Sequence, residues 1–119
     1  MCYSTVELPV MTKIPDLETR NATSITIRWR EWRNPPDRGS GPVSDYIVYY
    51  KARNETDWFA LNRSNFRSAS VANLQPMQSY QFRVAAVHLM GFVGPPSSAL
   101  TIITCGRKLQ YSLVLQVFV

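Results

Sequence analysis

The sequence predicts an all-β protein in which short antiparallel strands form a two-layered sandwich. Several segments alternate apolar and polar residues with a period of two, which is typical of strands that bury one face. Clusters rich in proline, glycine and asparagine separate these segments, and no segment has the period of an amphipathic helix. The 119 residues are 45% hydrophobic and 18% charged, which is the composition of one folded domain with a single core.

The clearest strand begins at Tyr80. From there, Tyr80, Phe82 and Val84 fall on one face of the strand and alternate with polar side chains. Leu74 and Pro76 precede it, and the proline, which lacks an N–H, indicates that the previous strand ends here and that the chain crosses over. A tyrosine just past such a corner can bury its ring while its hydroxyl hydrogen-bonds to the backbone upstream.

Two strands are expected near the N-terminus, over residues 12–19 and 24–29. Pro15 places the first at a sheet edge, because a proline cannot donate to a central ladder. The second alternates cleanly and ends on an inward tryptophan. The side chains that these two strands are predicted to bury are Ile14, Leu17, Ile25, Ile27 and Trp29.

Four further strands are expected over residues 43–51, 58–61, 69–74 and 99–104, after a proline- and glycine-rich loop over residues 34–42. Together with the strands above, they make seven. The inward side chains of the strand over residues 43–51 are predicted to be Val43, Tyr46, Val48 and Tyr50, and its outward ones Asp45, Ile47, Tyr49 and Lys51. The last strand is predicted to turn Leu100 and Ile102 inward.

The corner and the strand after it carry a family pattern. The run from Leu74 to Ala86 has the form L-x-P-x-x-x-Y-x-F-x-V-x-A and is followed by Gly-Pro-Pro-Ser at residues 94–97. With Trp29 and the Tyr-Ile-Val-Tyr-Tyr run of residues 46–50, it resembles a fibronectin type III domain over residues 12–105. The resemblance implies a seven-stranded immunoglobulin-like antiparallel sandwich. It implies a core of Trp29, Tyr46, Val48, Leu74, Tyr80, Phe82 and Val84.

The chain ends lie outside this pattern. Residues 1–11 are expected to be a linker or an edge segment, and residues 106–119 an apolar tail of unknown role. The tail is too short for a membrane span, which needs about 20 residues, so it is the truncated start of a span, an added strand or an extension foreign to the fold. Cys2 and Cys105 are expected about 20 Å or more apart, too far for a disulfide with each other.

Three N-x-[ST] sequons point to an extracellular setting, in a secreted protein or the ectodomain of a membrane protein. They start at Asn21, Asn54 and Asn62, in predicted turns or strand edges where a glycan is tolerated. The first eleven residues contain no apolar core of a signal peptide. We therefore expect the chain to be a piece of a longer protein.

No pattern for catalysis is present. The single histidine, His88, falls in a predicted loop, and no Cys, Asp or Glu stands at metal-ligand spacing from it. The sequence has neither a glycine-rich phosphate loop nor a nucleophile elbow. We expect no enzymatic activity, cofactor or metal in this chain, although the parent protein could carry a receptor kinase or phosphatase domain elsewhere.

Two apolar surfaces are candidates for binding a protein partner or a neighbouring domain. One is the outward face of the sheet that holds the strands near residues 47 and 85, and the other is the loop over residues 87–94. The alternatives are that a further domain, a glycan or the C-terminal tail covers the face, and that Phe92 and Val93 fold back over the core. The candidate residues are Ile47, Tyr49, Ala85, Val87, Trp58 and Phe59 for the face, and Leu89, Met90, Phe92 and Val93 for the loop.

A basic stripe is a third candidate. The chain has a net charge of +5, and Arg28, Arg30 and Arg33 are spaced to line one outer strand, where they could bind heparan sulfate. The alternative is scattered, solvated charge. Nucleic acid is not an expected partner, because no aromatic residue is interleaved with these arginines as a stacking platform.

We therefore expect a non-catalytic extracellular interaction and spacer module of a modular cell-surface receptor or adhesion protein. It would bind a protein partner through an exposed sheet face and loops. A heparan sulfate binding module and a purely structural spacer are the alternatives.

Overall fold

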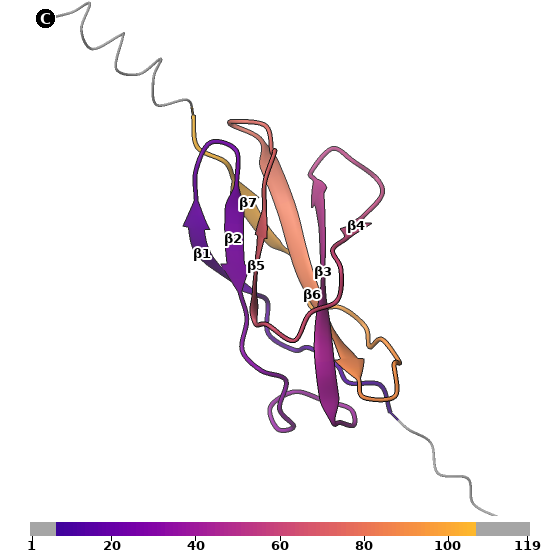
Figure 1. Cartoon of the computed structure of the whole chain (residues 1–119). Coiled ribbons are helices and arrows are strands. Elements are labelled where there is room, and N and C mark those ends of the chain that lie inside the picture. Colours follow the sequence, from indigo (N-terminus) through magenta and orange to yellow (C-terminus); the bar gives the residue numbers. More distant parts are fainter. Residues whose placement is uncertain (1–6, 107–119) are drawn as a thin grey trace, which may run out of the picture.

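The structure, a computed structural model, describes residues 7–106 as two packed antiparallel sheets without a helix. Three strands form one sheet in the order β1-β2-β5, and four form the other in the order β4-β3-β6-β7 (Figure 1). The predicted seven-stranded sandwich is confirmed. The strands are β1 (Asp16–Arg20), β2 (Ile25–Arg28), β3 (Val43–Ala52), β4 (Phe59–Ala60), β5 (Ser68–Val71), β6 (Ser79–His88) and β7 (Leu100–Ile103).

The core lies between the two sheets. Trp29, just past the end of β2, packs edge-on against Tyr46 of β3, with 5.7 Å between ring centroids. The Tyr46 hydroxyl accepts a hydrogen bond from the backbone N–H of Trp32 at 2.8 Å, and burial raises the pKa of this phenol. The structure buries Trp29, Tyr46, Val48, Leu74, Tyr80, Phe82 and Val84, the seven side chains that the family resemblance assigned to the core.

The tyrosine corner is present between β5 and β6. The Tyr80 hydroxyl accepts a hydrogen bond from the backbone N–H of Gln75 at 2.8 Å, so the buried ring leaves no unpaired polar atom. The buried hydroxyl of Thr104, after β7, donates to the Gln75 carbonyl at 2.6 Å and accepts from the Gln78 N–H at 3.0 Å. The corner is thus tied to the last strand as well as to its own tyrosine.

Two predictions about where strands begin and end are wrong. The first strand begins only at Asp16, so the expected alternation does not extend back to Ile14, which is 42% exposed. Met11 and Pro15 are buried instead. His88 does not lie in a loop but ends β6, where its ring is buried.

Residues 9–11 pack against the domain. The backbone N–H of Val10 donates to the Arg38 carbonyl at 2.8 Å, which joins this segment to the loop between β2 and β3. Figure 1 shows that the described chain enters at one end of the sandwich and leaves at the other. The predictions for Cys2 and for most of the C-terminal tail fall outside the described residues, and Cys105 is an exposed free thiol.

Candidate functional site

The hairpin tip is the turn of residues 88–93 that follows β6. Three backbone hydrogen bonds fix it, from His88 N–H to Phe92 O at 2.8 Å, from Gly91 N–H to His88 O at 2.7 Å and from Leu89 N–H to Pro42 O at 2.9 Å. Gly91 has a φ of +93°, a left-handed conformation that glycine adopts without strain. The tip is therefore held in one conformation by its own backbone and by a neighbouring loop.

The side chains of the hairpin tip point largely into solvent. Leu89 is 65% exposed, Met90 72% and Phe92 51%. Phe92 contacts the His88 ring with 6.4 Å between centroids, and Val93 makes a backbone bridge to Val87 while remaining 37% exposed. Phe92 and Val93 thus contact residues at the edge of the core but stay partly exposed, so the alternative in which they fold back over it holds only in part.

The ring of His88 supports the base of the hairpin tip. Its Nδ1 accepts a hydrogen bond from the Met90 N–H at 3.1 Å, and its Nε2 lies 3.2 Å from the Gly41 carbonyl. An Nδ1 that accepts leaves the proton on Nε2, which can then donate to Gly41. The histidine is thus a structural brace between two loops.

The outer face of the four-stranded sheet carries a stack of aromatic and cationic side chains. Arg83 of β6 lies directly opposite Tyr49 of β3 in the strand register, with its guanidinium carbon 5.5 Å from the centre of the Tyr49 ring. Trp58, just before β4, places its ring 4.1 Å from the same guanidinium carbon and 5.4 Å from Lys51 Nζ. We call these four residues the aromatic-cation platform.

The prediction that Ala85 and Val87 face solvent is wrong, since both are fully buried. Ala85 lies opposite the larger Ile47 in the register, and its methyl group is too short to reach past its neighbours. Val87 lies opposite Asp45 and bridges to Val93 of the hairpin. The alternation of residues correctly predicted that Ala85 and Val87 lie on the outer side of the sheet. It did not predict their burial, because side chains of the adjacent strands cover residues of a central strand on its outer face as well.

Of the other residues predicted for this face, Ile47 lies on the outer side of the sheet and Phe59 lies at the edge of the sandwich. Ile47 is half-buried, on the same outward side of β3 as Tyr49. Phe59 does not join Trp58, because its ring packs on Tyr50 with 5.7 Å between centroids and stays 49% exposed at the sandwich edge. The outward face is therefore smaller and more cationic than the sequence suggested.

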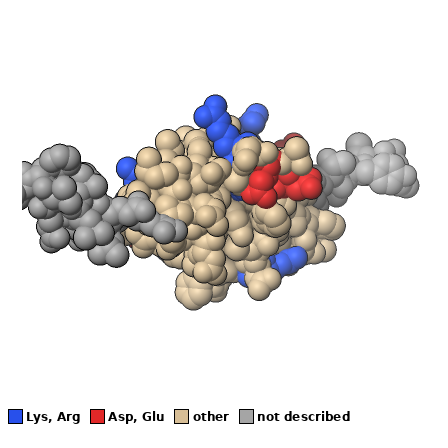
Figure 2. Space-filling view, turned by 90° about the horizontal axis from the view of Figure 1, so that it is seen from above, with Lys and Arg blue, Asp and Glu red and all other residues tan. Residues whose placement is uncertain are grey.

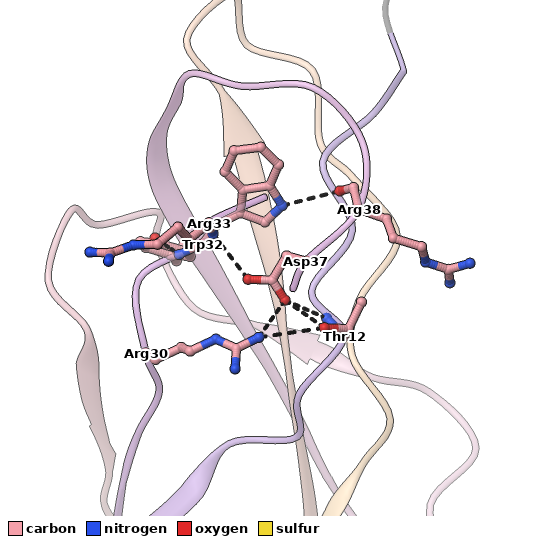
Figure 3. A network of polar contacts seen from close by, with 7 residues as sticks. Thr12, Arg30, Trp32, Arg33, Asp37 and Arg38 are labelled. Carbon is pink, nitrogen blue, oxygen red and sulfur yellow. Dashed lines mark hydrogen bonds and ion pairs between the residues drawn. The ribbon is translucent and has the colours of Figure 1, made fainter. Parts of the chain in front are cut away.

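A buried carboxylate, Asp37, organises the loop between β2 and β3 (Figure 3). It accepts hydrogen bonds from the N–H and the hydroxyl of Thr12 at 3.0 and 2.7 Å and from the Arg33 N–H at 3.0 Å, and it pairs with the Arg30 guanidinium at 2.8 Å. Burial alone would raise the pKa of Asp37, but the hydrogen bonds from Thr12, Arg33 and Arg30 outweigh burial and lower it. The sequence showed this residue only as part of a loop.

The arginine stripe is interrupted by carboxylates. Arg28 lies opposite Asp16 in the strand register, and Arg30 is paired with the buried Asp37. Glu31 lies 3.7 Å from Arg33, and 3.4 Å from Arg67. On the face shown in Figure 2, basic side chains gather in separate places, one of them beside a group of acidic side chains. The three arginines therefore do not form a continuous cationic surface.

All three sequon asparagines are exposed. Asn21 lies in the turn between β1 and β2, where its Oδ1 accepts hydrogen bonds from the N–H groups of Thr23 and Ser24 at 2.9 and 2.8 Å. Because the oxygen is engaged, the amide nitrogen that would carry a glycan is left without a role in the turn. Asn54 and Asn62 lie on either side of β4.

Within residues 7–106 the structure holds no group of three histidine, cysteine or carboxylate side chains arranged for a metal ion. In the same range, no helix of the length and apolarity of a membrane span is found. Among residues 7–106, the hairpin tip and the aromatic-cation platform are the two surfaces that differ most from an ordinary solvated exterior.

Comparison with known proteins gives several relatives that match part of the chain. The chain is 38% identical to human myomesin-2, in a match that covers 56% of this chain and 5% of that protein. It is also 38% identical to zebrafish receptor-type tyrosine-protein phosphatase F, in a match that covers 64% of this chain and 4% of that protein. It is 30% identical to chicken ephrin type-B receptor 5 over 82% of this chain and 10% of that protein. The chain thus spans a tenth or less of the length of these relatives.

Solved structures give the same fold. Domains A168–A170 of titin superimpose with a TM-score of 0.66 at 25% identity, covering 84% of this chain and 32% of the titin chain. The sequence profile of the fibronectin type III domain, a non-catalytic module, matches residues 14–103. With its seven strands in two sheets and its tyrosine corner, the chain belongs to the fibronectin type III family.

Proposed function

We propose that this domain is an extracellular interaction and spacer module of a modular cell-surface receptor or adhesion protein. It contacts a protein partner through the hairpin tip and the outer face of the four-stranded sheet. The observation that carries the proposal is the hairpin tip, where Leu89, Met90 and Phe92 are each more than half exposed on a turn that backbone hydrogen bonds hold in place.

The hairpin tip is ordered before any partner binds. Exposed apolar side chains gain free energy when a partner covers them, about 25 cal/mol per Å² of apolar surface. A mobile loop would lose part of this gain through the entropy of ordering, whereas a tip already held by its backbone hydrogen bonds and by the brace of His88 loses little. A rigid turn with exposed apolar side chains is therefore well suited to binding a protein, whereas exposure of the same side chains to water brings no gain in free energy.

The cell-surface setting rests on two supports. Receptor-type proteins are among the relatives, including a tyrosine phosphatase and an ephrin receptor. Asn21, Asn54 and Asn62 are all exposed, so each sequon is accessible for a glycan. The similarity to myomesin-2, whose name is not that of a receptor, keeps a structural spacer as the competing role. The arginine stripe gives heparan sulfate binding little support, because Arg30 and Arg33 each have a carboxylate within 4 Å and Arg28 lies opposite Asp16 in the strand register.

Secretion tests the setting. Fused to a secretory signal sequence in cultured mammalian cells, the chain should leave the cell folded and glycosylated, with a mobility shift that N-glycanase removes. Asn→Gln changes at residues 21, 54 and 62 should remove the shift stepwise. A chain retained and degraded inside the cell, or secreted without any glycan, would argue for the structural spacer.

Binding by the hairpin tip has its own test. An Fc fusion of the domain is screened on intact cells by flow cytometry, and the same fusion is made with Phe92→Ser. The matched control is Phe66→Ser, because Phe66 is 72% exposed but lies in the connection between β4 and β5. Loss of cell binding with the first change and not with the second supports the proposal. Equal binding of all three proteins contradicts it.

A further inference from the structure

The aromatic-cation platform contains a guanidinium that lacks the partners a half-buried guanidinium normally has. The Nε atom of Arg83 is buried and has no hydrogen-bond acceptor among the described residues. Buried donors in native proteins are nearly always paired, so an unpaired one calls for a physical explanation. The group is also held in place, because the rings of Trp58 and Tyr49 lie 4.1 and 5.5 Å from its central carbon.

Three other arginines of the domain have a carboxylate partner. Arg30, Arg33 and Arg67 each have a carboxylate within 4 Å, at 2.8, 3.7 and 3.4 Å. Within residues 7–106, no carboxylate forms an ion pair with either cation of the platform. Lys51 donates only to the backbone carbonyl of Glu55 at 2.9 Å. The platform thus has two cations, two aromatic rings and no anion.

We infer that the platform binds a carboxylate side chain, an Asp or Glu, presented by a segment of a protein partner. This inference rests on the proposed role as an interaction module and names the chemistry of its partner. Because Nε is buried, the terminal Nη1 and Nη2 groups of the Arg83 guanidinium are the donors left for a partner, and their planar fork matches the two oxygens of a carboxylate in a bidentate pair. Fixed between two rings, it needs little further ordering when the carboxylate arrives.

The surroundings favour a protein segment. Tryptophan, tyrosine and arginine are the residues in which interface energy usually concentrates, and the platform contains all three. Ile47 lies two residues before Tyr49 on the same side of β3 and offers apolar contact to a side chain next to the carboxylate. A sulfated polysaccharide instead needs a row of cations, whereas here only Lys51 accompanies Arg83.

The inference is tested with a random dodecapeptide library displayed on phage and selected on the intact chain. Enriched peptides should carry an Asp or Glu beside an apolar residue. The affinity of a synthetic peptide, measured by calorimetry, should fall more than about tenfold with Arg83→Gln. Arg83→Lys should retain only part of the affinity, because lysine keeps the positive charge but not the planar guanidinium that makes a bidentate pair. Replacing the acidic residue of the peptide by its amide should have the same effect as Arg83→Gln.

The matched control is Arg63→Gln, since Arg63 is an exposed arginine in the connection between β4 and β5. Its effect should be less than about twofold, because a solvated charge away from the contact contributes little. Heteronuclear NMR spectra of each variant establish that the fold is intact, and the Arg83→Lys protein provides a second measurement if Arg83→Gln disturbs Trp58.

Three results would overturn the inference. The first is that the enriched peptides lack acidic residues. The second is that Phe92→Ser abolishes peptide binding while Arg83→Gln leaves it unchanged. In the second case the hairpin tip remains a binding surface, so the proposed function survives without the platform. Binding of a heparin oligosaccharide or of 3′-sialyllactose that depends on Arg83, without any acidic peptide, would assign the platform to a glycan instead.

Discussion

Asp37→Asn probes the loop network most directly, because asparagine keeps the shape of the carboxylate and removes its charge. In the native domain Oδ1 accepts from Thr12 and Arg30, and Oδ2 accepts from the Arg33 N–H. If the amide oxygen takes the place of Oδ1, the amide NH₂ group faces the Arg33 N–H, and two donors then oppose each other. A buried donor left without an acceptor costs about 1 to 3 kcal/mol.

The expected loss is therefore about 2 kcal/mol at neutral pH. A domain of this size has a total free energy of unfolding of about 5 to 15 kcal/mol. Since 1 kcal/mol corresponds to about 4 to 8 °C in melting temperature for a domain of up to 100 residues, we expect a decrease of about 8 to 16 °C. The matched control is Asp16→Asn, because Asp16 is exposed and its ion pair with Lys13, at 3.6 Å, should contribute less than about 1 kcal/mol.

The pH dependence gives an independent check. Hydrogen bonds from Thr12, Arg33 and Arg30 overcome the effect of burial and leave the pKa of Asp37 lower in the folded protein than in the unfolded chain. A carboxyl of this kind stabilises the fold above its unfolded pKa, about 3.9, and this contribution is lost as the pH falls through the folded pKa. The difference in stability between wild type and variant should therefore narrow below about pH 4.

Thermal and urea unfolding followed by circular dichroism at pH 7, 5 and 3 measure both effects. The reasoning is refuted if the Asp37→Asn variant melts within about two degrees of wild type at pH 7. It is also refuted if the difference between them stays constant from pH 7 to pH 3. Either result would mean that the carboxylate charge contributes nothing to holding Thr12 and Arg30 in place.

Three further substitutions test the corner, the core and the N-terminal segment by thermal and urea unfolding. Tyr80→Phe removes the hydrogen bond from the Gln75 N–H and should cost about 1 to 3 kcal/mol, so an unchanged melt would contradict the role of the corner. Trp29→Ala should cost about 3 to 5 kcal/mol and leave a marginal fold, whereas a shift of one or two degrees would contradict its core position. Gly94→Ala should destabilise the domain, because its Cβ would collide with the Pro9 carbonyl; equal stability would show that residues 9–11 are not held as described.

The fold was predictable because its signals are local. Alternation around Tyr80 and Phe82 gave a strand, and the preceding proline gave the corner. Such local signals do not predict the burial of a side chain that is covered by residues distant in the sequence. Asp37 is 1% exposed only because Thr12 and Arg30, 25 and 7 residues away in the chain, converge on it. No periodicity in the sequence carries that information.

The platform shows the same limit at the candidate site. Alternation placed Tyr49 and Arg83 on the outer face, but Trp58 reaches them only through the turn that precedes β4. Glu55 shapes this turn, since its carboxylate accepts from the Ala52 N–H at 2.9 Å and its backbone carbonyl accepts from Lys51. Turn geometry of this kind depends on side-chain contacts that form only once β3 is in place.

The distribution of carboxylates separates two roles for arginine in this domain. Arg30 is engaged by the buried Asp37, and Arg33 and Arg67 share the exposed Glu31, so each of the three has a carboxylate partner within the domain. Arg83 is ordered by aromatic rings instead, which fix the guanidinium without neutralising it. An arginine that is both fixed and unneutralised remains attractive to an external anion. Net charge and arginine spacing alone therefore cannot locate a binding surface. The contacts that each guanidinium makes in the folded domain can, because they show which arginine still lacks a carboxylate.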